Sequence, residues 1–219
     1  MRSIWFAICI VAVLAISTAA VNAQLVDITR PGDTIEVVSG TNYEDADDGP
    51  PPGAEGVENV INDVGQKYLN FLDLGSGFAV TPSANPSNLP VVGIRFYTAN
   101  DAVSRDPSSY VLSGSNTGLN GTWTVIAGGL LALPDERNAG GEAVSIPPEG
   151  NLGAFNQTVM FDNSSSYESY RVIFPTLKDE LDANSMQIAD VELLVAIPEP
   201  AGICLALIAI GCLLVRRRR

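Results

Sequence analysis

The stretch VVGIRFYT, residues 91–98, alternates between two kinds of side chain. Val92, Ile94 and Phe96 would lie on one face of an extended chain, and Arg95 would lie on the other. A period of two residues is typical of a β-strand, because successive side chains point to opposite faces of a sheet. The stretch therefore predicts a strand with a hydrophobic layer packed against one face.

Similar short runs recur along the chain, separated by Gly, Pro, Asn and Asp. The expected strands lie near Ile28 and at residues 34–38, 67–71, 77–81, 91–98, 109–115, 122–128, 158–161, 170–174 and 186–195. Residues 132–153 hold few strand-forming residues and are expected to form one long loop. Many short strands, no helical period and no internal repeat predict an all-β fold, an antiparallel β-sandwich or jelly roll.

Both ends of the chain are hydrophobic and are expected to lie outside this sandwich. Residues 1–23 have a basic start, an apolar run and a small-residue cleavage site before Gln24, which is the pattern of a signal peptide helix. Residues 201–215 carry no charge and would form a short transmembrane helix, about 22 Å long. The part between them, residues 24–196, is then exported and is long enough for one domain with its own core.

The tail, residues 197–219, combines Pro198-Glu199-Pro200, the short apolar run and a basic end. The basic end consists of Arg216, Arg217, Arg218 and Arg219. These three elements in this order resemble the PEP-CTERM sorting signal of Gram-negative bacteria. The resemblance implies processing by an exosortase, a transient hold in the inner membrane, and delivery to the cell surface or an extracellular polysaccharide matrix.

The residue types that are missing exclude several kinds of chemistry. All three cysteines, Cys9, Cys204 and Cys212, lie in the hydrophobic ends, and the chain has no histidine. The exported part therefore has neither a disulfide framework nor thiol chemistry. The absence of histidine excludes Ser-His-Asp and Cys-His nucleophile systems and removes most zinc sites.

The exported part is strongly acidic, with 24 of the 25 acidic residues and 7 of the 12 basic ones. Such a surface repels nucleic acid and suits hard cations such as Ca²⁺, although acidity as a solubility device explains most of these carboxylates equally well. The segment NYEDADDGPPPGAEG, residues 42–56, is expected to be an exposed acidic loop. It fails the spacing of a calcium-binding helix–loop–helix hand, because Glu44 and Ala46 stand where Asp is required.

Three segments of the exported part follow one another in a familiar order. They are EGVENVINDVGQKYLNF at residues 55–71, TANDAVSRDPSSYVLSGSN at residues 98–116, and QIADVEL at residues 187–193. Together they resemble the discoidin-like, galactose-binding jelly roll, a family that includes coagulation-factor type C domains and carbohydrate-binding modules. Two departures stand out, since Tyr68 replaces the usual tryptophan and Asn62-Asp63-Val64-Gly65 replaces the usual Asp-Gly step.

The resemblance implies a structural Ca²⁺ near the chain ends. Carried over onto this sequence, its ligands would be Asn62, Asp63 and Glu192, with backbone carbonyls adding oxygens. Calcium takes six to eight oxygen ligands in a flexible cage, so this donor set is chemically suitable. The alternative is that Asp63 makes an Asx-turn and Glu192 faces water on an edge strand.

Sugar-binding members of that family use loops at one end of the sandwich. The candidates here are Asn100, Arg105, Asp106, Arg137 and Asn138. A structural alternative is open for each, because Arg105-Asp106-Pro107 would also make a rigid turn held by an ion pair. Tyr110 and Trp123 fall in expected strands, which favours roles in packing.

Three functions follow from these observations. The first is a non-catalytic surface or matrix protein whose jelly roll, stabilised by Ca²⁺, binds extracellular polysaccharide. The second is a structural coat component without a small ligand. The third is a glycosidase, which needs only two carboxylates. Because nothing in the sequence distinguishes one pair among the many acids, we expect the protein not to be an enzyme.

Overall fold

The structure is a computed structural model of the chain. It describes residues 23–38, 53–71, 74–85, 88–137, 146 and 155–198. The chain divides into two compact units, Val26–Val195 and the pair of ends Met1–Leu25 with Ala196–Arg219. Of the second unit, the described residues are 23–25 and 196–198. The expected signal peptide, most of the acidic loop, Glu199, Pro200 and the basic end lie outside the described residues.

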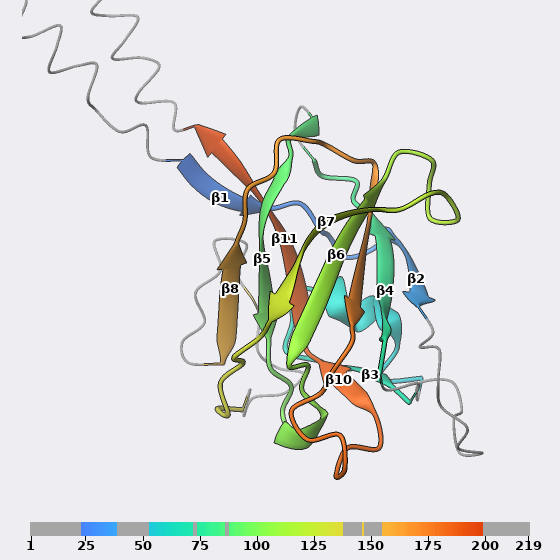
Figure 1. Cartoon of the computed structure of the whole chain (residues 1–219), viewed down its shortest axis with the longest axis vertical. Coiled ribbons are helices and arrows are strands. Elements are labelled where there is room, and N and C mark those ends of the chain that lie inside the picture. The colour runs from blue at the N-terminus through green and yellow to red at the C-terminus, as the bar shows by residue number, and fades with distance from the viewer. Residues whose placement is uncertain are drawn as a thin grey trace, which may run out of the picture. The chain divides into compact units, whose positions relative to one another are not determined.

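Two antiparallel sheets and a short strand pair make up the unit Val26–Val195 (Figure 1). The four-stranded sheet has the order β1 (Ala23–Asp27), β11 (Asp190–Pro198), β5 (Val91–Tyr97) and β8 (Asn156–Met160). The five-stranded sheet has the order β2 (Thr34–Val38), β4 (Ser76–Thr81), β9 (Ser169–Phe174), β6 (Ser109–Ser115) and β7 (Thr124–Leu130). The pair consists of β10 (Met186–Ile188) and β3 (Tyr68–Asn70).

The prediction of an all-β antiparallel sandwich is confirmed for the part of the chain that the structure describes. Its helical elements are short 3-10 turns, among them η1 (Val57–Ile61) and η3 (Val103–Arg105). Within the described residues no helix is long and apolar enough to span a membrane. The expected membrane segment, residues 201–215, falls outside them.

The hydrophobic core lies between the two sheets and is built on aromatic contacts. Phe96 of β5 lies with its ring centroid 5.3 Å from that of Tyr110 on β6 and 6.1 Å from that of Phe174 on β9. All three are buried, as are Ile94 and Leu112 on the same strands. The alternation read in residues 91–98 therefore identifies the core face correctly, and the prediction that Tyr110 is a core residue is confirmed.

Two expected strands differ in the structure. The segment 186–195 does not form one strand, because the chain leaves β10 at Ile188 and enters β11 at Asp190, in another sheet. Ala189 at the break donates its N–H to the carbonyl of Tyr97. Trp123 lies just before β7 instead of within it, half-buried, with the Arg171 guanidinium carbon 4.8 Å from its ring centroid.

The loops fall at two opposite ends of the sandwich. The segment between β4 and β5 precedes β5, whereas the turn that contains η3 follows it. Seven residues of extended chain separate these two segments, which corresponds to roughly 20 Å. Figure 1 shows the same arrangement, with the β4–β5 and β8–β9 connections at one end and η3 at the other.

Candidate functional site

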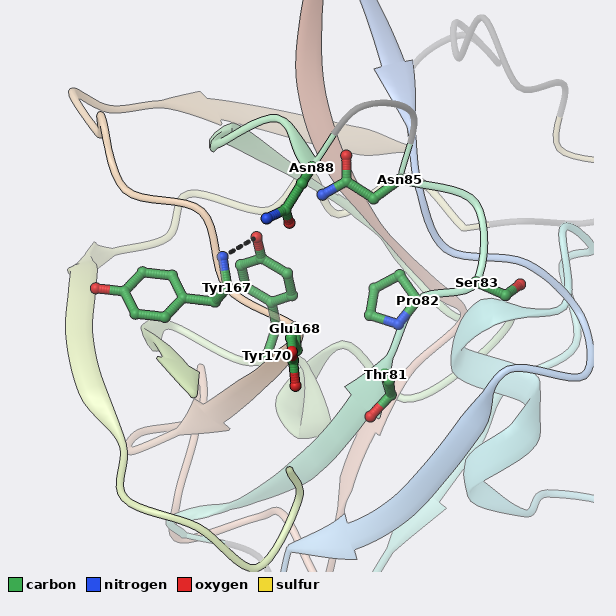
Figure 2. A pocket seen from close by; sticks show the side chains of 8 residues that line it. All are labelled: Thr81, Pro82, Ser83, Asn85, Asn88, Tyr167, Glu168 and Tyr170. Atoms are coloured by element: carbon green, nitrogen blue, oxygen red, sulfur yellow. Dashed lines mark hydrogen bonds between the residues drawn. The ribbon is translucent and has the colours of Figure 1, made fainter. Parts of the chain in front are cut away.

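A pocket of about 300 Å³ opens at the end of the sandwich formed by the β4–β5 and β8–β9 connections (Figure 2). Its volume is at the lower limit of small-molecule sites in proteins. The lining residues come from two segments far apart in sequence, Thr81, Pro82, Ser83, Asn85 and Asn88 from the first and Tyr167, Glu168 and Tyr170 from the second.

Strand pairing brings these two segments together. β4 runs antiparallel to β9, so the end of β4 lies beside the start of β9. The hydroxyl oxygens of Thr81 and Ser169 are 2.8 Å apart, which ties the two walls of the pocket at their base. The pocket is therefore a direct product of sheet topology.

Hydrogen bonds within the β4–β5 connection fix its shape. The Asn85 side chain accepts a bond from the Leu89 N–H at 2.9 Å and donates one to the Leu89 carbonyl at 3.0 Å. The Ser83 N–H donates to the Asp33 carboxylate at 3.0 Å. These side chains are committed to the loop, so they preorganise the wall and leave ligand contacts to other groups.

The two tyrosines have different roles. The Tyr170 ring stands among the other lining side chains, whereas the Tyr167 ring turns away from them (Figure 2). The Tyr167 ring packs on Gly114, where an added Cβ would collide with it. The Tyr167 N–H donates to the Tyr170 hydroxyl at 3.3 Å, and burial raises the pKa of Tyr170. Tyr170 is only 1% exposed, so its ring lies beneath the pocket surface, where Tyr167 helps to hold it in place.

Two polar side chains of the pocket remain available for a ligand. Glu168 and Asn88 are exposed, and neither side chain forms a hydrogen bond or ion pair within the described part of the chain. Asn88 has a left-handed backbone with φ 53°, which asparagine tolerates better than most residues. The pocket therefore combines one free amide and one free carboxylate.

The expected sugar-binding residues lie at the opposite end of the sandwich. Asp106 is fully buried and accepts two hydrogen bonds from the Arg137 guanidinium, at 2.9 and 2.8 Å. Lys178 adds an ion pair to the same carboxylate at 3.2 Å. The partners of Asp106 are thus Arg137 and Lys178, not the neighbouring Arg105. This arrangement clamps three loops together, so Asp106 and Arg137 have structural partners already.

The other members of that expected set differ from this pair. Asn100 is exposed and Arg105 is half-buried, and neither side chain has a polar partner among the described residues. Asn138 lies outside the described residues. Of the five candidates, Asn100 and Arg105 have the side chains that a ligand could use.

Two of the three expected calcium ligands already have partners within the protein. Glu192 is buried, and its carboxylate accepts hydrogen bonds from Arg95 and, at 3.0 Å, from the Tyr97 hydroxyl. The Asn62 side-chain oxygen accepts the Val64 N–H at 3.1 Å, so Asn62, and not Asp63, makes the Asx-turn. Protein donors therefore engage the oxygens of two of the three expected ligands.

Asp190, which is not among the expected calcium ligands, is the carboxylate that forms a hydrogen bond with Asp63. The Asp63 N–H donates to Asp190 Oδ2 at 3.1 Å, and Asp63 itself has a left-handed backbone with φ 59°. Asp190 is 1% exposed, and its Oδ1 has no hydrogen-bond partner. Across the described residues, no group of three or more acidic or cysteine side chains is arranged to hold a metal ion. The orphaned oxygen and the Asp63 carboxylate fit part of a calcium site.

Four carboxylates gather on this side of the core. Burial raises the pKa of Asp27 to about 6 and that of Glu192 to about 7. Burial also raises the pKa of Asp63, and that of Asp190 well above its ordinary value, with repulsion from the neighbouring acids adding to the second shift. The fold is therefore more stable when protons or a cation neutralise the carboxylates of this cluster.

The sequence analysis did not predict the pocket, because the residues that line it lie in two turn-rich segments, PSANPSNLP and FDNSSSYESY. Such segments look like ordinary connections. The one available signal is that Tyr167 and Tyr170 flank Glu168 in a segment whose other residues are mostly small and polar. An aromatic residue in such a loop is a candidate contact for a ligand.

No protein-family model matches this sequence, and no curated protein matches it. Solved structures match its fold. The family 32 carbohydrate-binding module of NanJ from C. perfringens, solved with galactose, superposes with a TM-score of 0.50 at 13% identity, over 78% of this chain and 98% of the module. The F5/8 type C domain of a Bacteroides fragilis protein gives a TM-score of 0.49 at 13% identity, over 80% and 98%. The likeness to the NanJ module assigns the jelly-roll fold to this sandwich.

Proposed function

We propose that the exported domain is a non-catalytic glycan-binding module of a bacterial cell surface or extracellular matrix. The observation that carries the proposal is the pocket between the β4–β5 and β8–β9 connections, with its free amide and carboxylate. The solved module that shares the fold holds galactose, which supports a sugar as the class of ligand.

The chemistry of the pocket suits one sugar ring. A pyranose presents C–H groups on its faces and hydroxyls around its rim. Pro82 offers apolar contact, Glu168 accepts hydrogen bonds from hydroxyls, and Asn88 both donates and accepts. Because Glu168 is the one charged lining residue in an acidic domain, neutral and amino sugars are favoured over uronic acids.

The pocket does not have the parts of a glycosidase. Both retaining and inverting glycosidases use a pair of carboxyl groups that flank the scissile bond. The described residues that line this pocket include one carboxylate, Glu168. We therefore propose binding without catalysis.

Calcium and sorting belong to the same proposal. Asp63 and Asp190, rather than Glu192, would hold a Ca²⁺ ion, and the ion would neutralise the buried Asp190 and the half-buried Asp63 and tie the η1 segment to β11. The signal peptide and the PEP-CTERM-like tail would pass the protein through the inner membrane and an exosortase to the outside. An acidic coat component without a small ligand is the alternative.

The test is a binding screen of residues 24–196 against neutral, amino and acidic glycans, followed by substitutions at both ends of the sandwich. Glu168→Ala should weaken binding at least about tenfold, which corresponds to the loss of one charge-assisted hydrogen bond. Glu180→Ala, at an exposed glutamate in the turn before β10, is the matched control and should have no effect.

Arg105→Ala tests which of the two ends of the sandwich carries the binding site. If it abolishes binding while Glu168→Ala does not, the site lies at the η3 end and the pocket assignment is wrong. If folded protein binds no glycan in the screen, the glycan-binding proposal fails and the coat function stands.

A further inference from the structure

We propose that β7 is a self-association edge, at which the five-stranded sheet pairs with the same strand of a second copy of this chain. The inference goes beyond glycan binding and does not depend on it, because none of the residues that line the pocket belongs to β7. It concerns the outer edge of β7, which pairs with β6 alone among the described strands.

The backbone of β7 is paired on one side only. β7 is the last strand in the order β2-β4-β9-β6-β7, and its register with β6 runs from Leu130 opposite Ser109 to Thr124 opposite Gly114. Among the described residues, no hydrogen bond is formed on its outer edge. Unpaired N–H and C=O groups in a row are a template for another strand.

The side chains of β7 do not protect this edge. Val125 is 68% exposed and Leu130 is 85% exposed. Natural edge strands are usually protected by Lys, Pro or an inward-pointing charge, and β7 has none of these. The edge strand β2, at the other side of the same sheet, carries the exposed Glu36.

The edge strand β8 of the other sheet is also uncharged, but several of its side chains are committed. Gln157 accepts the Ala132 N–H at 2.8 Å, and Thr158 accepts a bond from Arg95 at 2.8 Å. Asp162 follows two residues after its end. β7 is therefore the better candidate of the two.

Charge identifies a second copy as the occupant. The exported part carries 24 acidic residues, so two copies repel each other over most of their surfaces. Residues 107–134, which include β6 and β7, contain no Asp, Glu, Lys or Arg. This is the longest uncharged run in the exported part. Contact through β7 lets two acidic domains approach with their charges kept apart.

The geometry limits the extent of pairing. The register between β6 and β7 shifts so that Ile126 has no partner on β6, which marks a bulge in β7. A bulge bends a strand and interrupts a ladder, so pairing would use residues 127–130. Two copies related by a two-fold axis would present the same four residues to each other, as in the commonest kind of homodimer. So short a ladder predicts a weak, reversible dimer.

The experiment is sedimentation of the full chain in nonionic detergent over a wide range of concentration. Leu130→Glu should raise the dimer dissociation constant at least about tenfold, because the two-fold axis brings one new negative charge from each copy into the contact. Leu181→Glu is the matched control, because Leu181 is fully exposed in a turn and receives the same charge. Added salt should strengthen the dimer by screening the repulsion between acidic surfaces.

Hydrogen exchange provides a second measurement. Association through the hydrophobic ends of the chain would not change the exchange rates of the β7 amides. The β7 amides should exchange more slowly as the concentration of the wild-type chain rises, and this protection should be lost in Leu130→Glu. A chain that stays monomeric, or a dimer that Leu130→Glu and Leu181→Glu weaken equally, would overturn the proposal. So would a dimer that Met160→Glu on β8 dissociates and Leu130→Glu does not.

Discussion

The buried pair of Arg95 and Glu192 offers the sharpest test of how this domain is stabilised. The register of β11 on β5 places the two residues directly opposite each other. Arg95 is 7% exposed and Glu192 is 1% exposed. Arg95→Met keeps most of the side-chain volume and removes the positive charge. Glu192 then keeps the Tyr97 hydrogen bond and loses the one basic side chain that pairs with it among the described residues.

The cost of this substitution should depend on pH. Breaking a buried ion pair by removing one partner typically costs about 3–5 kcal/mol, because the remaining charge is uncompensated. Burial raises the pKa of Glu192 to about 7 even with Arg95 beside it. Without Arg95 this pKa rises further. We therefore expect the loss near pH 8, where the wild-type carboxylate is largely ionised, to exceed the loss near pH 5, where Glu192 is protonated in both proteins, by about 1 kcal/mol.

Urea unfolding of residues 24–196 at the two pH values measures this difference. Lys67→Met is the control, because Lys67 pairs with the partly exposed Asp101 and Glu55 and should cost about 0–1 kcal/mol. The double variant Arg95→Met/Glu192→Gln should recover most of the loss at pH 8. A loss that is equal at pH 5 and pH 8 would refute the reasoning, since it would come from packing and not from charge.

Two further predictions concern the buried acids. Burial raises the pKa of Asp27 from 3.8 to about 6, so the folded state holds this proton more tightly than the unfolded state does. Its contribution to the free energy of unfolding is greatest below pH 4 and declines by about 3 kcal/mol as pH rises through 6. We expect the melting temperature to fall between pH 4.5 and 7.5, and to fall less in Asp190→Asn; a rise with pH in that interval would contradict this. Calcium should raise the melting temperature at pH 7 in the wild type, but not in Asp190→Asn, with magnesium as the control for ionic strength. Identical melting curves with calcium and with a chelator would exclude the Asp63–Asp190 site.

Local sequence pattern was enough to find most strands. β2 and β6 have the predicted bounds, because each is a short alternating run that turn residues terminate on both sides. The division of residues 186–195 could not be predicted, since MQIADVELLV reads as one continuous strand. The chain changes sheets at Ala189 because Tyr97 and Ile146 pack there, and that contact depends on residues far away in sequence.

The same limit explains the acidic residues. Asp190 and Glu192 lie two apart on one strand and therefore share a face of the sheet. Only the register decides that Glu192 lies opposite Arg95 and Asp190 opposite Tyr97. The sequence alone gives no physical reason to prefer Glu192 to Asp190 as a calcium ligand, because either acid fits the motif. The pocket depends on non-local pairing too, since Thr81 meets Ser169 only through the alignment of β4 with β9.

Residues 24–196 contain no cysteine, and buried ion pairs join segments that disulfides could otherwise have linked. Asp106 joins three loops through Arg137 and Lys178, and Glu192 joins β11 to β5 through Arg95. In both clamps a buried carboxylate has a basic partner within reach. Asp190 differs, because the donor it meets is a backbone N–H and one of its oxygens has no partner. A carboxylate in this position destabilises the fold at neutral pH unless a proton or a cation neutralises it. The stability of this end of the sandwich should therefore follow the calcium concentration around the domain, whereas the stability of the two clamps should not.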